Sequence, residues 1–317
     1  MSKRKPKECR RYVDLWAVPG IHPSNIEFLQ KLKTADTQHF TKNMNAVGTV
    51  KEQILETKKW ETSYLIGVRT DIWKPDAAEM ERTLEVMQEK RKDEKRREIK
   101  GHGRLSEKQS QDLAEQLSED AVMQLQSEDV ERRRLVLKLF KTAGERVNWA
   151  GTIEEITTTE IQSSLGSNRS LLTMAVMLPR NDYVTTVQQT HRTFRIPSVF
   201  SFCYFLDDQV YYVLLQRRWF SIGADFDVIC EGQSIGLIDG RLIGFGSDSY
   251  LNLTDHPLST NVQFIDLLTL FAASIGYHAA MRRSVRERVT AYLAGEGDRH
   301  VIDDEELRLR HNGRKAA

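Results

Sequence analysis

The stretch that decides the fold runs from residue 210 to residue 245 and reads VYYVLLQRRWFSIGADFDVICEGQSIGLIDGRLIGF. In its middle, Phe226, Val228 and Cys230 alternate with their neighbours in the two-residue period of a strand. Gly232 follows, where a positive φ permits a hairpin turn, and Asp239-Gly240 is typical of a type I′ hairpin. Short strands joined by tight turns in this way predict an antiparallel sheet that closes into a barrel or sandwich.

Downstream of this stretch, the strand pattern continues to Leu253 and ends at His256-Pro257. A helix is predicted for 261–281, with Ser259 or Thr260 as its cap. Its polar residues are Gln263, Asp266, Ser274 and His278. They fall within about a third of the helical circumference, and the other positions are apolar. Such a helix has to be enclosed, either by protein or by lipid.

Residues 210–229 and 231–246 resemble the tubby-like superfamily, and within it the LURP-one-related and phospholipid-scramblase branch. The resemblance lies in a basic, aromatic strand, then an Asp-aromatic-Asp-apolar strand, a Gly turn, and an apolar strand ending in a Gly-basic turn. It implies a twelve-stranded barrel threaded by a hydrophobic C-terminal helix, and members that bind phosphoinositides or are linked to lipid scrambling. Calcium-driven scrambling is not expected, because residues 254–263 contain Asp255 as their single acid.

The rest of the chain completes an α+β organisation. Residues 144–290 are expected to form the tubby-like barrel around a central helix, and 1–75 a mixed segment that can contribute strands. Residues 76–143 are expected to form a charged helical arm, whose last helix starts near Ser127 and ends at Gly144, and 291–317 a polar tail. Within the barrel, Ile153–Ile161 and Leu171–Leu178 are expected to be strands.

Composition limits the classes of partner. Lys plus Arg (46) nearly balances Asp plus Glu (45), so the whole chain is not a polyelectrolyte that binds nucleic acid. Local basic clusters stand near the N-terminus, including Arg10 and Arg11, and after the apolar helix. Three scattered cysteines without a CxxC pair argue against a disulfide framework or a structural zinc site. The expected location is cytoplasmic, with peripheral attachment to a membrane as an open alternative.

A ligand-binding set is predicted around the deciding stretch: Arg217, Arg218, Trp219, Asp225, Asp227 and Arg241. Arginines beside a tryptophan suit an anionic headgroup or a partner carboxylate, and the alternative is an ordinary exposed strand. Asp225 and Asp227 lie two apart on one strand and so on one face, which allows a carboxylate pair or a solvated surface. No metal site or cofactor is predicted.

The apolar helix raises two further questions. Asp266 and His278 are polar groups on an enclosed helix, so each needs either a hydrogen bond within the core or a ligand. A basic patch follows the helix and comprises Arg282, Arg283, Arg286 and Arg288. An apolar helix followed by arginines is the arrangement of a membrane span with a cytoplasmic anchor, and the alternative is that the arginines complement the helix dipole.

The leading functional hypothesis is a non-enzymatic binding protein whose barrel engages an anionic lipid surface or a protein partner. The 76–143 arm is expected to support homo-oligomer or partner contacts. One alternative is a nucleic-acid-associated factor that uses the basic tail and the 90–100 run, although the acids in that run weaken it. Another is a hydrolase with its site at the barrel mouth. No catalytic residue is predicted, because His191, His256 and His278 are accompanied by no catalytic motif.

Overall fold

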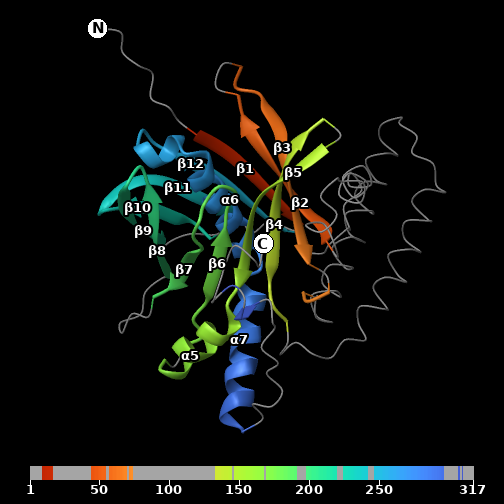
Figure 1. The fold of residues 1–317 in the computed structure, drawn as a ribbon, viewed down its shortest axis with the longest axis vertical. Helices are drawn as coiled ribbons and strands as arrows, with labels where there is room; N and C mark the ends of the chain where they lie inside the picture. The colour runs from red at the N-terminus through yellow and green to blue at the C-terminus, as the bar shows by residue number, and fades with distance from the viewer. Residues whose placement is uncertain are drawn as a thin grey trace, which may run out of the picture.

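Twelve antiparallel strands form a closed barrel (Figure 1). The computed structural model describes residues 9–16, 44–54, 57–69, 71–73, 133–144, 146–167, 169–190, 198–219, 224–241, 246–295, 306–307 and 309. The strands are β1 (Cys9–Trp16), β2 (Met44–Gln53), β3 (Trp60–Arg69), β4 (Val136–Ala143), β5 (Arg146–Glu155), β6 (Thr173–Met177), β7 (Thr185–Gln189), β8 (Val199–Leu206), β9 (Gln209–Arg217), β10 (Phe226–Cys230), β11 (Gln233–Arg241) and β12 (Gly246–Leu253). The predicted antiparallel barrel is confirmed at this level.

Strands from before residue 144 close the barrel. β1 pairs with β12 on one side and with β2 on the other, so the first and last strands lie side by side. The helix expected up to Gly144 is wrong over its last eight residues, which form β4. Leu135, Leu137 and Leu139 belong to the main core, whereas Phe140 packs in a separate cluster outside it. This two-residue alternation is a strand pattern. The rest of the arm, from 76 to 132, lies outside the described residues.

A short helix replaces the second half of an expected strand. The strand predicted for Ile153–Ile161 ends with β5, and α5 (Thr157–Leu165) follows. β-Branched residues favour strands, but here Glu160 and Ser164 lie four apart and are both buried, which is a helical spacing. Ser164 Oγ accepts from the Leu171 N–H at 2.9 Å, and Glu160 is bonded to Thr173 and Arg288. These tertiary contacts outweigh the local propensity.

The hairpin predictions divide into one success and one error. Glu231 and Gly232 both have positive φ, 49° and 82°, and form the predicted turn between β10 and β11. Asp239-Gly240 forms no turn, because β11 continues through it to Arg241. Gly240 is required for close approach instead, since a Cβ there would lie 2.7 Å from the Ala224 carbonyl oxygen.

Replacing Gly240 by alanine should therefore lower the free energy of unfolding by about 1–3 kcal/mol, the usual cost of overpacking. Denaturant unfolding measures the change. The matched control is Gly166→Ala, where φ is −82° and an added Cβ meets no atom within 4 Å. That control should be neutral or stabilising by up to about 1 kcal/mol. Equal effects of the two substitutions would contradict the explanation.

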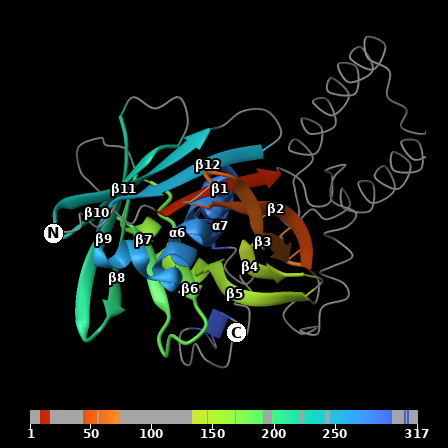
Figure 2. The ribbon, with the colours of Figure 1, turned by 90° about the horizontal axis from the view of Figure 1, so that it is seen from above.

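The apolar helix runs inside the barrel. α6 (Val262–Ile275) contacts β1, β4, β5 and β12, and every residue from Phe264 to Ile275 is buried. Figure 2 shows it within the ring of strands. Asn261 caps the helix by accepting from the Phe264 N–H at 2.9 Å, whereas the predicted caps, Ser259 and Thr260, form the 3-10 turn η3 (Pro257–Thr260).

The helix does not continue straight to Met281. It ends at Ile275, and α7 (His278–Leu293) leaves at an angle of 71°. Among the described residues, no single helix is long and apolar enough to span a membrane, and α6 with α7 passes such a test only as a bent pair. We call the end of the barrel near Leu253, where α6 begins, the entry end. The opposite end, where α7 emerges, is the exit end; Figure 1 shows α7 projecting from it.

Candidate functional site

One face of α7 carries a row of basic side chains at the exit end. His278, Arg282 and Arg286 recur at every fourth position, so they project from the same side of the helix. Arg286 is exposed, whereas His278 and Arg282 are half-buried. His278 packs against the ring of Phe200 on β8, with the ring centroids 6.4 Å apart. The row therefore begins under the rim of the barrel and extends into solvent.

Two arginines from other elements join this row. Arg217 ends β9, and Arg169 follows α5. Both act electrostatically on Arg282: burial lowers the pKa of its guanidinium, and Arg286, Arg169 and Arg217 lower it further. We call Arg169, Arg217, His278, Arg282 and Arg286 the exit-end basic cluster. It is built from three separate segments of the chain.

His278 is neutral in the free protein. Burial is the main cause, and the charges of Arg282 and Arg217 add to it, so that the pKa of His278 falls to about 4. Among the described residues, His278 Nε2 and Arg282 Nε are buried without a hydrogen-bond partner. An unpaired buried polar group costs about 1–3 kcal/mol. A bound oxyanion would reduce the repulsion between these like charges and would accept hydrogen bonds from the unpaired donors.

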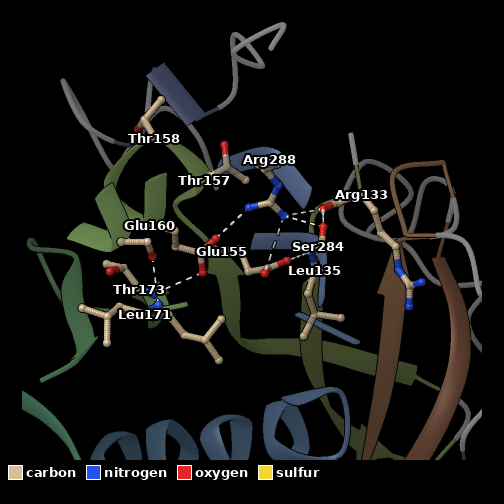
Figure 3. A network of polar contacts seen from close by, with 12 residues as sticks. Arg133, Leu135, Glu155, Thr157, Thr158, Glu160, Leu171, Thr173, Ser284 and Arg288 are labelled. Carbon is tan, nitrogen blue, oxygen red and sulfur yellow. Dashed lines mark hydrogen bonds and ion pairs between the residues drawn. The ribbon is translucent and has the colours of Figure 1, made fainter. Parts of the chain in front are cut away.

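The opposite face of α7 is fixed to the barrel by a buried ionic network (Figure 3). Arg288 Nη1 donates to Glu160 Oε2 at 2.8 Å, and Nη2 donates to the Arg133 carbonyl oxygen at 2.7 Å and to Ser284 Oγ at 2.9 Å. Arg288 Nη2 also lies 3.8 Å from Glu155 Oε1. One arginine thus ties α7 to α5, to β5 and to the segment before β4.

Two acids share this arginine in a fully buried position. Glu155 accepts from the Leu135 N–H, and Glu160 Oε1 accepts from the Thr173 N–H at 3.1 Å. Burial raises the pKa of both carboxyls, and the neighbouring Glu155 raises that of Glu160 further. Because Glu155 and Glu160 are 0% exposed, substrate has no access to them. The network positions α7 and α5, and so the arginines of the basic cluster.

The C-terminal segment adds a second restraint on α5. Glu306 Oε1 accepts from the Thr158 N–H at 2.8 Å and from Thr158 Oγ1 at 2.6 Å, and Oε2 accepts from Thr157 Oγ1 at 2.6 Å. A carboxylate at a helix N-terminus satisfies its free N–H groups. Leu309 packs nearby on Ile156 and Ala175. Part of the predicted polar tail is therefore docked on the barrel.

A separate ionic network lies toward the entry end, where Arg11 contacts α6. Arg11 Nη1 donates to Asp266 Oδ1 at 2.6 Å and to Thr269 Oγ1 at 3.0 Å, while Nη2 donates to the Tyr64 hydroxyl at 2.8 Å. Glu52 pairs with the same guanidinium. Burial opposes the charge of Arg11, but Asp266, Tyr64 and Glu52 raise its pKa. Asp266 is thus a satisfied core group, and Arg11 is not part of a basic surface.

The predicted ligand set at the end of β9 divides into three parts. Arg218 forms a bidentate ion pair with Asp227, in which Nη2 lies 2.7 Å from Oδ1, so the two charges offset one another. Asp225 Oδ1 accepts from the Gly240 N–H at 3.1 Å. Asp225 and Asp227 are therefore engaged separately and do not form a carboxylate pair. Arg217 joins the basic cluster, Trp219 follows it by two residues and is 53% exposed, and the Arg241 side chain lies outside the described residues.

The predicted basic patch after the helix also divides. Arg282 and Arg286 belong to the basic cluster, Arg288 is buried in the ionic network, and Arg283 lies between these two faces. Residues four apart share a helix face, which separates 282 and 286 from 288. Sequence reasoning missed Arg169, Glu155, Glu160 and Glu306 as site-forming residues. For Glu160, the local signal was its four-residue spacing from Ser164, which is typical of one face of a helix.

His256 and His278, the two of the three candidate histidines that the structure describes, lie at opposite ends of the barrel. His256 Nδ1 accepts from the Leu258 N–H at 3.2 Å at the entry end, whereas His278 lies at the exit end. His191 lies outside the described residues. Within the part of the chain that the structure describes, no three His, Cys, Asp or Glu side chains are grouped to hold a metal ion.

The fold and the site together define a closed twelve-stranded barrel that encloses a helix and carries a basic cluster at one end. No protein-family model, curated protein or solved structure matches the chain.

Proposed function

We propose that this is a non-enzymatic binding protein of the tubby-like type, which attaches peripherally to an anionic lipid surface through the exit end of its barrel. The observation that carries the proposal is the exit-end basic cluster, in which every charged neighbour that shifts the pKa of Arg282 is another arginine. The sequence resemblance of residues 210–246 and a barrel that encloses an apolar helix support the family assignment.

A lipid surface suits this end because an exposed aromatic residue closely follows Arg217 in the chain. Trp219 is 53% exposed and follows Arg217 by two residues. Tryptophan places its apolar ring and its polar N–H at the boundary between hydrocarbon and headgroups, while arginines are attracted to anionic lipid. The rigid attachment of α7 through Arg288 holds the basic row in a fixed orientation toward such a surface.

The test is liposome flotation with the double variant Arg282→Gln/Arg286→Gln. Wild-type protein should float with phosphatidylserine vesicles and not with neutral phosphatidylcholine vesicles. Each arginine near an anionic surface contributes about 1 kcal/mol, so the double variant should partition about 30-fold more weakly. Wild-type retention should also weaken with added salt, because screening shortens the reach of these charges.

The matched control is Lys58→Gln/Lys59→Gln, which removes the same charge from the exposed turn between β2 and β3 at the entry end. It should float like wild type. A wild-type protein that stays unbound on anionic vesicles, or a control that loses as much retention as the α7 variant, would contradict the proposal. Retention on an immobilised acidic protein without flotation would favour the protein partner instead.

A further inference from the structure

We propose that the exit-end basic cluster is a site for one phosphomonoester group, with Arg217, Arg282 and Arg286 as its charged ligands and His278 as the donor beneath them. This inference rests on the proposed function, because it specifies the chemistry of the ligand at the same site. It is decided by a preference between phosphate types, which general attraction to an anionic membrane does not produce.

The balance of charge favours a dianion. Three arginines act on Arg282 at this end, and no acid appears among the groups that shift its pKa. A phosphodiester headgroup carries one negative charge, whereas a phosphomonoester carries about −1.5 to −2 near neutral pH and offers three acceptor oxygens. A single monoester therefore offsets as much of the repulsion as two diester lipids, without the need to gather two headgroups.

The arrangement of the arginines favours a compact group with several oxygens. Arg282 and Arg286 lie one turn apart on α7, Arg217 comes from the end of β9, and Arg169 comes from the segment after α5. Donors that converge from three segments reach different oxygens of one group. A planar guanidinium binds two phosphate oxygens at once, which an ammonium group does not.

His278 supplies the feature that an ordinary basic surface lacks. Its Nε2 is buried and, among the described residues, has no hydrogen-bond partner, and the same is true of Arg282 Nε one turn further on. His278 is also the first residue of α7, the helix that carries Arg282 and Arg286. The groups that act on His278 are Arg282 from α7 and Arg217 from β9, and Phe200 from β8 packs on its ring.

Burial, and then the positive charges of Arg282 and Arg217, lower the pKa of His278, so the imidazole is neutral at pH 7 in the free protein. A bound dianion reverses that local field and favours the protonated imidazole, which then donates from Nε2. Binding of the monoester should therefore raise the pKa of His278.

The experiment compares two phosphate types in two settings. In flotation, vesicles of phosphatidic acid, a monoester lipid, are set against phosphatidylserine vesicles matched in surface potential. In solution, glycerol 3-phosphate is set against dimethyl phosphate, and the imidazole resonances of His278 are followed by NMR across pH. We expect tighter partition onto phosphatidic acid, and a raised His278 pKa with glycerol 3-phosphate but not with the diester.

Arg282→Lys separates bidentate hydrogen bonding to the phosphate from simple attraction between charges. It retains the positive charge, so the readout is the ratio of partition onto phosphatidic acid to partition onto phosphatidylserine, whatever the absolute binding of the variant. That ratio should fall about tenfold, the effect of losing one charge-assisted hydrogen bond. The Lys58→Gln/Lys59→Gln control should keep the full preference.

Each result has a defined consequence. A His278 response to soluble glycerol 3-phosphate, or a preference for phosphatidic acid that the lysine variant loses, supports the site; the solution experiment tells whether the headgroup alone suffices. Equal partition onto both vesicles together with a silent His278 overturns this inference and leaves the proposed membrane attachment standing. Absence of any flotation removes membrane attachment, and the NMR titration still decides the phosphomonoester site.

Discussion

Arg288→Met is expected to lower the free energy of unfolding by about 3–5 kcal/mol at pH 7, the usual cost of removing one partner from a buried charge network. The guanidinium is 2% exposed and is hydrogen-bonded to Glu160, with Glu155 nearby, both of which are 0% exposed. Without Arg288, two buried carboxyls face each other with less compensation. Denaturant unfolding followed by circular dichroism measures the loss.

The loss in Arg288→Met should depend on pH in a specific direction. The folded-state pKa of Glu160 is already above its usual range, because of burial and then Glu155, and removal of Arg288 raises it further. A carboxyl whose pKa is raised in the folded state binds its proton more tightly there, so stability falls as pH rises through the raised pKa. The difference between variant and wild type should therefore shrink as pH is lowered toward the ordinary carboxyl pKa.

Arg286→Met is the control for this experiment, because Arg286 stands on the same helix and is exposed. A surface substitution of this kind usually changes stability by no more than about 0.5 kcal/mol. If Arg288→Met were as mild as the control, Arg288 would not be the residue that holds α7 and α5 together.

Arg11→Met is expected to have a comparable effect at the other end of the barrel. Its guanidinium is the hydrogen-bond partner of Asp266, a largely buried carboxylate on the second turn of α6. Loss of that partner leaves an uncompensated buried charge and should cost about 3–5 kcal/mol at neutral pH. Thermal or denaturant unfolding of the full chain gives the value.

Here too the sign of the pH effect follows from the direction of the shift. Burial raises the pKa of Asp266, and Arg11 counteracts that rise. Without Arg11 the folded carboxyl keeps its proton to a higher pH, so the variant loses most stability above that pH and regains part of it on acidification. A loss that grew on acidification would contradict this account.

The double variant Arg11→Met/Asp266→Leu tests the pair directly. Replacing both partners of a buried ion pair by apolar groups is often nearly neutral, so the double variant should be more stable than Arg11→Met alone. The interaction energy of the cycle should be about 1–3 kcal/mol. Additive effects of the two substitutions would show that Arg11 and Asp266 act independently.

Much of the barrel could be predicted from residues close together in the chain. The alternation of Phe226, Val228 and Cys230 predicted β10, and Gly232 predicted the turn after it. The turn at Asp207-Asp208, where both residues have positive φ, was missed although acidic residues tolerate that conformation. The hairpin turn predicted at Asp239-Gly240 is wrong, because the glycine is required there for close approach to Ala224 and not for a turn.

The candidate site was only partly predictable, for a different reason. Arginines at 217, 282 and 286 were selected by their types, but a sequence does not show which basic residues pair with acids. Arg218 is neutralised by Asp227 from the next strand, and Arg288 by Glu160 from a helix 128 positions away. Arg282 differs from Arg218 and Arg288 because the charged groups that shift its pKa are arginines, an outcome that depends on strand order and helix packing.

By itself, the sequence determined that short strands alternate apolar and polar residues near the C-terminus, and that the segment after them is too apolar to be exposed. These properties depend on side chains two to four positions apart, and local geometry converts them into strands and a helix. Tertiary structure decided that β1 to β4 close the barrel, that Asp266 meets an arginine 255 positions away, and that four arginines gather at one end. Those outcomes follow from which segments become neighbours when the ring closes, and no local pattern encodes that choice.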